Sequence, residues 1–227
     1  MSLQLRTSLR RRYVGIAAQN ARPVRRYFDA QTVPRLHVGC GLNILDGWLN
    51  CDLNPKRPDV LPMDATKRFP FDDGKFDYVY SEHFVEHIDY AGGQNIFREC
   101  YRILKPGGII RITTPDLAFL VGLYSKNQTD QQRAYIEWAT KNFIKNAPAA
   151  RDVYVINNFF YCDWGHQFIY DKESLAAALS SAGFIKLTFH QVGESEHEYL
   201  KNLEHVHRMP EGFLQLESMT IEGQKPA

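Results

Sequence analysis

Two histidines and a glutamate near the middle of the chain are spaced so that they could bind a metal. His83, Glu86 and His87 form the pattern H-x-x-E-H, the zinc-site pattern of one class of peptidases. On a helix, residues four apart lie on the same face, so the two imidazoles could hold Zn²⁺ with the carboxylate beside a metal-bound water. Zinc hydrolysis is therefore one chemistry to weigh for this sequence.

A second set of residues suits the binding of a nucleoside. Gly39 and Gly41 follow a short apolar run, and a backbone without Cβ atoms lets a ligand approach closely. Asp52 ends the next apolar run, where a carboxylate can accept two hydrogen bonds from a ribose diol. Asp64 follows a third run and could accept from the exocyclic amine of adenine. The dinucleotide fingerprint G-x-G-x-x-G is incomplete, because Ile44 stands at its last glycine position, which argues against a hydride-transferring enzyme.

The hydrophobic pattern predicts the elements that would position these residues. Strands are predicted at residues 35–38, 48–52, 60–61, 76–80, 109–113, 184–192 and 213–222, and helices at residues 94–104 and 172–182. Strands that alternate with helices indicate an α/β sheet that is mostly parallel. Residues 115–170, with a helix predicted at 130–144 and many aromatic side chains, form a long insertion after the fifth strand. We expect this insertion to cap a pocket at the carboxyl end of the sheet.

Longer motifs add to the glycine and aspartate pattern. They read L-H-V-G-C-G at residues 36–41, F-D-Y-V-Y-S at residues 76–81 and E-C-Y-R-I-L-K-P-G-G-I-I-R-I at residues 99–112. In this order they resemble class I S-adenosylmethionine (SAM)-dependent methyltransferases, over about residues 34–225. The resemblance implies a Rossmann-like fold whose mostly parallel sheet has an antiparallel last strand. The phrase G-W-L-N-C-D at residues 47–52 is most similar to predicted methyltransferases that accompany surface-polysaccharide biosynthesis.

The resemblance also implies which residues bind the cofactor SAM. These positions are Val38, Gly39, Cys40, Gly41, Asp52, Leu53, Asp64, Ala65, Ser81 and Glu82. The two glycines would border the methionine part, Asp52 the ribose, and Asp64 with Ala65 the adenine. Ser81, Glu82 and His83, just past the fourth strand, would lie beside the methyl donor and acceptor.

One departure from the family concerns the connection between the first two strands. Only nine residues, 39–47, separate them, whereas a parallel crossover normally needs a dozen or more, usually with a helix. We therefore expect the first helix to be very short or missing, which leaves the cofactor contacts of residues 40–44 open.

Methyl transfer to a hydroxyl needs a base, and two histidines are candidates. These are His83 and His166, because an unperturbed imidazole has a pKa of about 6.5. His166 lies in Y-C-D-W-G-H-Q-F-I-Y at residues 161–170, whose aromatic side chains would suit a sugar or ring face, or pack in a core. We expect methyl transfer to a small molecule or saccharide, at oxygen rather than nitrogen. A non-catalytic SAM- or nucleotide-binding module is an alternative. The zinc hydrolase is another, although His83 begins too soon after a strand to be helical, and we expect no metal.

Composition bounds the remaining possibilities. The chain has 227 residues and a net charge of +1, which gives no indication of nucleic-acid binding. Residues 1–33 form an arginine-rich amphipathic arm that could contact an anionic membrane surface or simply pack on the domain. No apolar run approaches the ~18 residues that a membrane span needs, and no signal peptide is evident, so we expect a cytoplasmic protein. The four cysteines form no C-x-x-C pair and should be reduced thiols.

Overall fold

The computed structural model describes residues 21–161 and 165–227, and its centre is a seven-stranded sheet. Residues 1–20, which hold most of the predicted basic arm, lie outside the described residues, as does Cys162. The strands are β1 (Arg35–Val38), β2 (Leu49–Asp52), β3 (Leu61–Pro62), β4 (Phe76–Glu82), β5 (Leu104–Pro115), β6 (Ile185–His190) and β7 (Ser218–Gln224). Their order is β3-β2-β1-β4-β5-β7-β6, and only β7 runs antiparallel to its neighbours. The predicted α/β fold with an antiparallel last strand is confirmed.

Helices and short 3₁₀ turns connect the strands. The helices are α2 (Ala21–Ala30), α3 (Tyr90–Ile103), α4 (Leu117–Gly122), α5 (Asp130–Phe143), α6 (Asp152–Tyr161), α7 (Lys172–Ser181) and α8 (Phe213–Glu217). The 3₁₀ turns are η1 (Val85–His87), η2 (Glu198–Leu200) and η3 (Val206–Arg208). Residues 39–48, between β1 and β2, contain turns and no helix, as the short spacing predicted. None of the helices in the described part of the chain has the length and apolar character that crossing a membrane requires.

The predicted last strand at residues 213–222 is wrong in its first half. Residues 213–217 form α8, and the strand β7 begins at Ser218 and ends at Gln224. Gly212, with a φ of 81°, turns the chain into the helix, and Phe213 packs against Tyr135 and Trp138 of α5. A run of apolar residues does not distinguish a short buried helix from a strand, and here a contact with the distant helix α5 decides between them.

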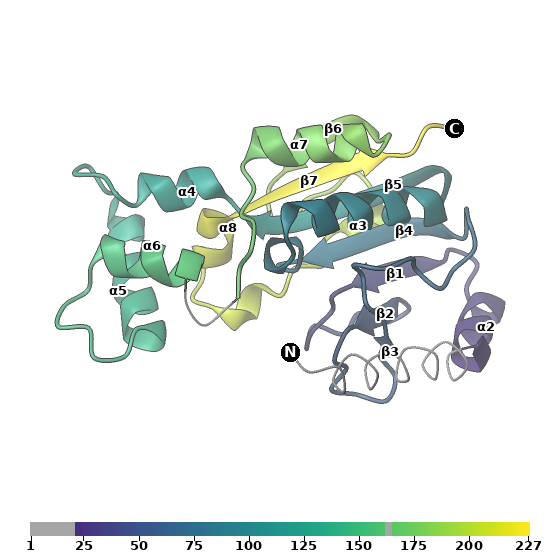
Figure 1. Cartoon of the computed structure of the whole chain (residues 1–227), viewed down its shortest axis with the longest axis horizontal. Coiled ribbons are helices and arrows are strands. Elements are labelled where there is room, and N and C mark those ends of the chain that lie inside the picture. Colours follow the sequence, from purple (N-terminus) through teal and green to yellow (C-terminus); the bar gives the residue numbers. More distant parts are fainter. Residues whose placement is uncertain (1–20, 162–164) are drawn as a thin grey trace, which may run out of the picture.

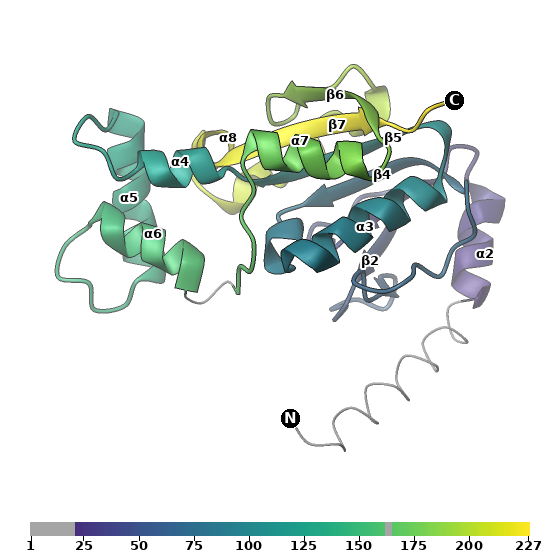
Figure 2. The same ribbon diagram turned by 45° about the horizontal axis from the view of Figure 1, so that its top comes forward.

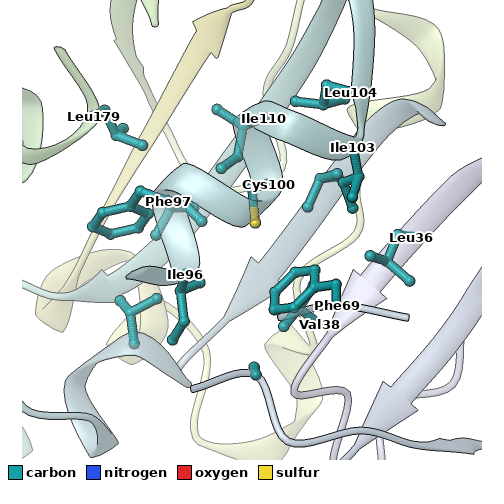
Figure 3. Packing of buried hydrophobic residues seen from close by; sticks show 14 of the residues in the cluster. Leu36, Val38, Phe69, Ile96, Phe97, Cys100, Ile103, Leu104, Ile110 and Leu179 are labelled. Atoms are coloured by element: carbon teal, nitrogen blue, oxygen red, sulfur yellow. The ribbon is translucent and has the colours of Figure 1, made fainter. Parts of the chain in front are cut away.

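One face of the sheet is apolar and is covered by α3 and α7. Figure 3 shows side chains of α3 directed toward those of the sheet, with Leu179 of α7 beside them. The labelled residues are Leu36, Val38, Phe69, Ile96, Phe97, Cys100, Ile103, Leu104, Ile110 and Leu179, all buried. The helix α3 begins four residues earlier than predicted, because the Asp89 carboxylate accepts the Gly92 N–H and caps it.

The other face of the sheet is unusually polar, and an extended segment crosses it instead of a helix. We call this segment, residues 191–212, the strap. Leu200 of the strap packs on Trp48, Tyr80 and Ile109. Beside this cluster lies Arg111, which is fully buried.

Arg111 is held by two carboxylates. Its Nε donates to Glu204 Oε1 of the strap over 2.8 Å, and its Nη1 donates to Glu222 Oε1 of β7 over 2.6 Å. Glu204 also accepts from the Thr113 hydroxyl and the Gly193 N–H. The strap is therefore attached to the sheet through a buried charge cluster.

The insertion after β5 forms a lobe at one end of the sheet. Figure 1 shows α4, α5 and α6 gathered beyond the carboxyl ends of β4 and β5, while α2 lies at the opposite end. Figure 2, turned by 45°, shows the same separation. The lobe has a core of its own, in which Tyr135, Ile136 and Phe159 pack with Phe213 of α8. That this lobe caps a ligand stays a prediction.

Candidate active site

The carboxyl ends of β1, β2 and β4 lie side by side, and the predicted cofactor residues follow them. Gly39 and Gly41 both have positive φ, 69° and 52°. A Cβ added to Gly41 would meet no atom within 4 Å, whereas one added to Gly39 would lie 2.3 Å from Phe84 Cγ. The two glycines therefore have different roles. The missing side chain of Gly41 leaves free space beside the backbone, whereas that of Gly39 leaves room for the Phe84 ring.

The two predicted aspartates are held by backbone hydrogen bonds. Asp52 Oδ2 accepts the Gly41 N–H over 3.1 Å, and its Oδ1 accepts the Asn54 N–H over 2.8 Å. Asp52 thus joins the glycine loop to the end of β2. Leu53 beside it is 58% exposed, an apolar surface next to the carboxylate. Asp64 Oδ1 accepts from the Thr66 N–H and hydroxyl, which orders the turn that follows β3.

The remaining predicted positions on this edge lie deeper. Val38, Cys40 and Ala65 are buried, and burial raises the pKa of the Cys40 thiol to about 12. Ser81 Oγ is buried without a hydrogen-bond partner among the described residues. Glu82 accepts from Asn43 Nδ2 and from the His205 N–H, so it joins the glycine loop to the strap.

A cavity of about 220 Å³ lies between this end of the sheet and the insertion. It is lined by His83, Glu86, His87, Pro115, Tyr135, Trp138, Phe143, Phe159, His166, Arg208, Met209 and Glu217. Aromatic rings from α5 and α6 form its walls, and imidazole and carboxylate groups line the rest. The two predicted catalytic histidines, 83 residues apart in the sequence, thus lie in one cavity.

His83 is held by contacts on both sides of its ring. Its backbone has a φ of 46°, so the residue is not helical, and η1 begins only at Val85. The zinc-binding helix with His83 and His87 on one face is therefore wrong for this chain. His83 Nε2 lies 2.7 Å from Ser218 Oγ and 3.9 Å from Glu217 Oε1, and Nδ1 lies 3.4 Å from Glu86 Oε1.

Glu86 is the most deeply buried carboxylate of the cavity, with no exposed surface. Its Oε2 accepts from the Thr114 hydroxyl over 3.0 Å. Burial raises the pKa of Glu86, but the adjacent His83 and His87 rings outweigh this effect and lower its pKa below the usual value. Glu86 is therefore ionised at neutral pH.

His166 lies beside His87 in the cavity, with ring centroids 4.8 Å apart. Its Nδ1 lies 2.8 Å from the Phe159 carbonyl oxygen. A carbonyl can only accept, so Nδ1 carries the proton and Nε2 the lone pair of the neutral ring. Burial lowers the pKa of His166, which keeps the ring neutral at pH 7.

Comparisons with known proteins agree with this architecture. A family model described as a methyltransferase domain matches residues 40–112, which run from the glycine loop into β5. This match, which covers less than half of the chain, supports a SAM-dependent methyltransferase domain. The matched residues include Asp52, Asp64 and Ser81, three of the predicted cofactor positions.

Individual relatives are more distant. Phosphoethanolamine N-methyltransferase 2 of Caenorhabditis elegans is 31% identical over 85 residues, which are 37% of this chain and 17% of the relative. A SAM-dependent methyltransferase from Archaeoglobus fulgidus has a TM-score of 0.53 at 19% identity, over 92% of this chain and 93% of that one. A possible exported protein from Bordetella parapertussis has a TM-score of 0.52 at 15% identity, over 96% and 68%. The two solved structures share the fold.

The cofactor edge fits SAM, the methyl donor of this class. Gly41 opens onto free space, Leu53 presents an apolar surface beside the Asp52 carboxylate, and Ser81 Oγ is a buried polar atom without a described partner. A bound nucleoside needs such features: close backbone approach, acceptors for its hydroxyls and an apolar surface for its base.

Several residues that line the cavity were not singled out from the sequence. Tyr135 and Trp138 come from α5, Arg208 from η3 and Glu217 from α8. The aromatic content of the insertion was a signal for the first two. The sequence contained no signal for Glu217, because the predicted strand at residues 213–222 does not place it at the end of α8.

Proposed function

We propose that the chain transfers the methyl group of SAM to a hydroxyl of a small molecule or saccharide bound in the cavity under the insertion. The observation that supports the proposal most directly is the position of the cavity. His83, which lines the cavity, follows Ser81 and Glu82 at the end of β4. An acceptor in the cavity would therefore lie next to the edge that fits the cofactor. The bound cofactor supplies a methyl group activated on a sulfonium, and the chain supplies position, exclusion of water and a proton acceptor.

The aromatic walls are suited to a ring-shaped acceptor. Tyr135, Trp138, Phe143 and Phe159 surround the cavity, and Tyr135 and Phe159 are fully or almost fully buried. Flat side chains of this kind contact the faces of sugar and aromatic rings. Together with the similarity of residues 47–52 to polysaccharide-associated methyltransferases, they support a saccharide hydroxyl as the acceptor.

His83 is the proton acceptor in this proposal. It lies between two buried carboxylates, Glu86 at 3.4 Å and Glu217 at 3.9 Å. Negative groups on both sides of an imidazole stabilise the positive charge that forms when it takes a proton. His166, the second candidate, lies beside His87 and would position the acceptor.

The test combines cofactor binding with turnover. Calorimetry should show SAM and S-adenosylhomocysteine binding to the full chain, and Asp52→Ala should weaken SAM about 10- to 100-fold, because charge-assisted hydrogen bonds are worth about 1.5–3 kcal/mol. The matched control is Asp29→Ala on α2, at the opposite end of the sheet. Absence of SAM binding to the folded wild type would overturn the proposal.

Turnover is followed as S-adenosylhomocysteine formed with a panel of sugars and phenols. His83→Gln should slow it about 10²- to 10⁴-fold, as expected for loss of a general base, with SAM affinity unchanged. A fully active His83→Gln would remove His83 as the proton acceptor. Binding of SAM without turnover on any acceptor would favour the non-catalytic binding module.

A further inference from the structure

Three metal-ligating side chains meet in the cavity although the sequence pattern placed only two of them together. They are Glu86 and His87 from η1 and His166 from the segment before α7. One donor atom from each lies within 4.8 Å of the other two. Two of the three fixed positions of the H-x-x-E-H motif, Glu86 and His87, therefore take part in a cluster, and His166 takes the place that the motif gives to His83.

Backbone hydrogen bonds hold the two segments against each other. The N–H groups of Gln167 and Phe168 donate to the Glu86 carbonyl oxygen, over 2.7 and 3.2 Å. The Gln167 side-chain amide donates to the His87 carbonyl oxygen over 2.7 Å. Four of the five atoms in these contacts belong to the backbone, so the segment that carries His166 is fixed to η1 independently of the side chains of the three candidate ligands.

The surroundings of the cluster match those of a metal site. Glu86 Oε2 is oriented by the Thr114 hydroxyl, while Oε1 is buried without a hydrogen-bond partner among the described residues. His83 Nδ1, at 3.4 Å from Oε1, is too far for a strong hydrogen bond. The Phe159 carbonyl fixes the His166 tautomer, as second-shell carbonyls do for metal-bound histidines. A buried carboxylate oxygen whose described partner is an imidazole at 3.4 Å, and which lies beside the rings of His87 and His166, suits a cation.

We propose that Glu86, His87 and His166 bind a divalent transition-metal ion, with Zn²⁺ as the reference ion. Two imidazoles and one carboxylate are a ligand set that such ions accept. Metal–ligand bonds of about 2.0–2.2 Å bring tetrahedral ligand atoms to about 3.4 Å from one another, so the side chains must draw together by roughly 1 Å on binding.

Three protein ligands leave a coordination position open, and the cluster lines the cavity. Resting on the proposed function, the open position would take the acceptor hydroxyl. A bound cation lowers the pKa of a coordinated hydroxyl, and the proton released would pass to His83. The metal would then orient the acceptor oxygen, and His166 would act as a ligand.

The test measures metal binding directly. Full-length protein, freed of metal with a chelator, is titrated with Zn²⁺ by calorimetry and with Co²⁺ by visible absorption, whose intensity reports the coordination geometry. The wild type should bind one ion per chain. His87→Gln and His166→Gln should each weaken metal binding at least 10-fold. The controls are His83→Gln in the same cavity and His207→Gln at an exposed position of the strap, and both should retain metal binding.

The outcomes separate this inference from the proposed function. If the folded wild type binds SAM but neither metal, the metal site is refuted and methyl transfer stands. Unchanged metal affinity in both His87→Gln and His166→Gln would also refute the site, because the ion would then be bound elsewhere. Circular dichroism and SAM affinity confirm that each variant is folded, and the two histidine variants test the site independently.

Discussion

The charge cluster beneath the strap leads to a sharp prediction about stability. Replacing Glu204 by glutamine keeps the volume of the side chain but removes the charge that faces Arg111. Both side chains have no exposed surface, and the Arg111 Nη2 to Glu204 Oε1 distance is 2.8 Å. Arg111 would then keep only Glu222 as a charged partner, so its buried positive charge would lose part of the negative charge that stabilises it.

The expected cost follows from burial. Removing one member of a buried ion pair typically costs 3–5 kcal/mol, and the remaining Glu222 and the amide oxygen of glutamine offset part of this. We therefore expect Glu204→Gln to lower the free energy of unfolding by about 3 kcal/mol. Glu198→Gln is the matched control, since Glu198 Oε2 lies 2.9 Å from Lys201 Nζ but its side chain is 84% exposed. The control should change the free energy by less than about 1 kcal/mol.

The assay is urea unfolding, followed by tryptophan fluorescence and circular dichroism, with the free energy extrapolated to water. Added salt should reduce the small effect of Glu198→Gln more than that of Glu204→Gln, because exposed charges are screened and buried ones are not. If Glu204→Gln costs no more than Glu198→Gln, the buried cluster does not attach the strap as we argue.

Two further predictions concern the sheet and the glycine loop. Burial lowers the pKa of His37 to about 4 from an ordinary value of 6.5, so the unfolded chain binds more protons between these values and stability should fall by about 3 kcal/mol as the pH drops from above 6.5 to 4. The unfolding free energy should depend less on pH across this range in His37→Gln, whereas the exposed His207→Gln should keep the pH dependence of the wild type. Equal pH dependence in the two variants would refute the assignment. Gly39→Ala should lower the unfolding free energy by about 2–4 kcal/mol, because the strain of a left-handed backbone adds to the clash with Phe84. Gly107→Ala is the control: Gly107 has a φ of 80° and open space around it, so this variant should lose only the backbone part, about 1–2 kcal/mol. Equal thermal and urea midpoints for the two variants would show that Phe84 moves aside without cost.

The sequence was sufficient to predict most of the sheet, because local patterns carry that information. The β1, β2 and β5 strands are apolar runs that end at or just before glycine, aspartate or proline. The strand β5 begins at Leu104, directly after α3 and five residues before the predicted strand, so it includes Lys105-Pro106-Gly107-Gly108. The absence of a helix before β2 followed from counting nine residues. The contacts that make residues 213–217 helical come from α5, some 80 residues earlier, and no local pattern contains them.

The candidate site was predicted only in part, because contacts between segments far apart in the sequence complete it. His83 and His166 stood out as titratable residues, and both line the cavity, while their catalytic roles stay predictions. The pairing of His166 with His87 and Glu86 depends on the hydrogen bonds of Gln167 and Phe168 to η1, which join segments 80 residues apart. Arg111 likewise has partners in the strap and in β7, both far along the chain. Such long-range polar contacts leave no periodic signal in the sequence.

The order of the sheet has a consequence for synthesis on the ribosome. β7 lies between β5 and β6, so β6 has no strand to join until residues 218–224 have been made. Until then one side of the twelve-residue β5 remains an unpaired edge, and Arg111 lacks Glu222. An exposed edge of this length can pair with another chain. Closing the sheet therefore depends on residues 218–224, and slow translation of the segment between β5 and β7 would prolong exposure of the β5 edge to misassembly.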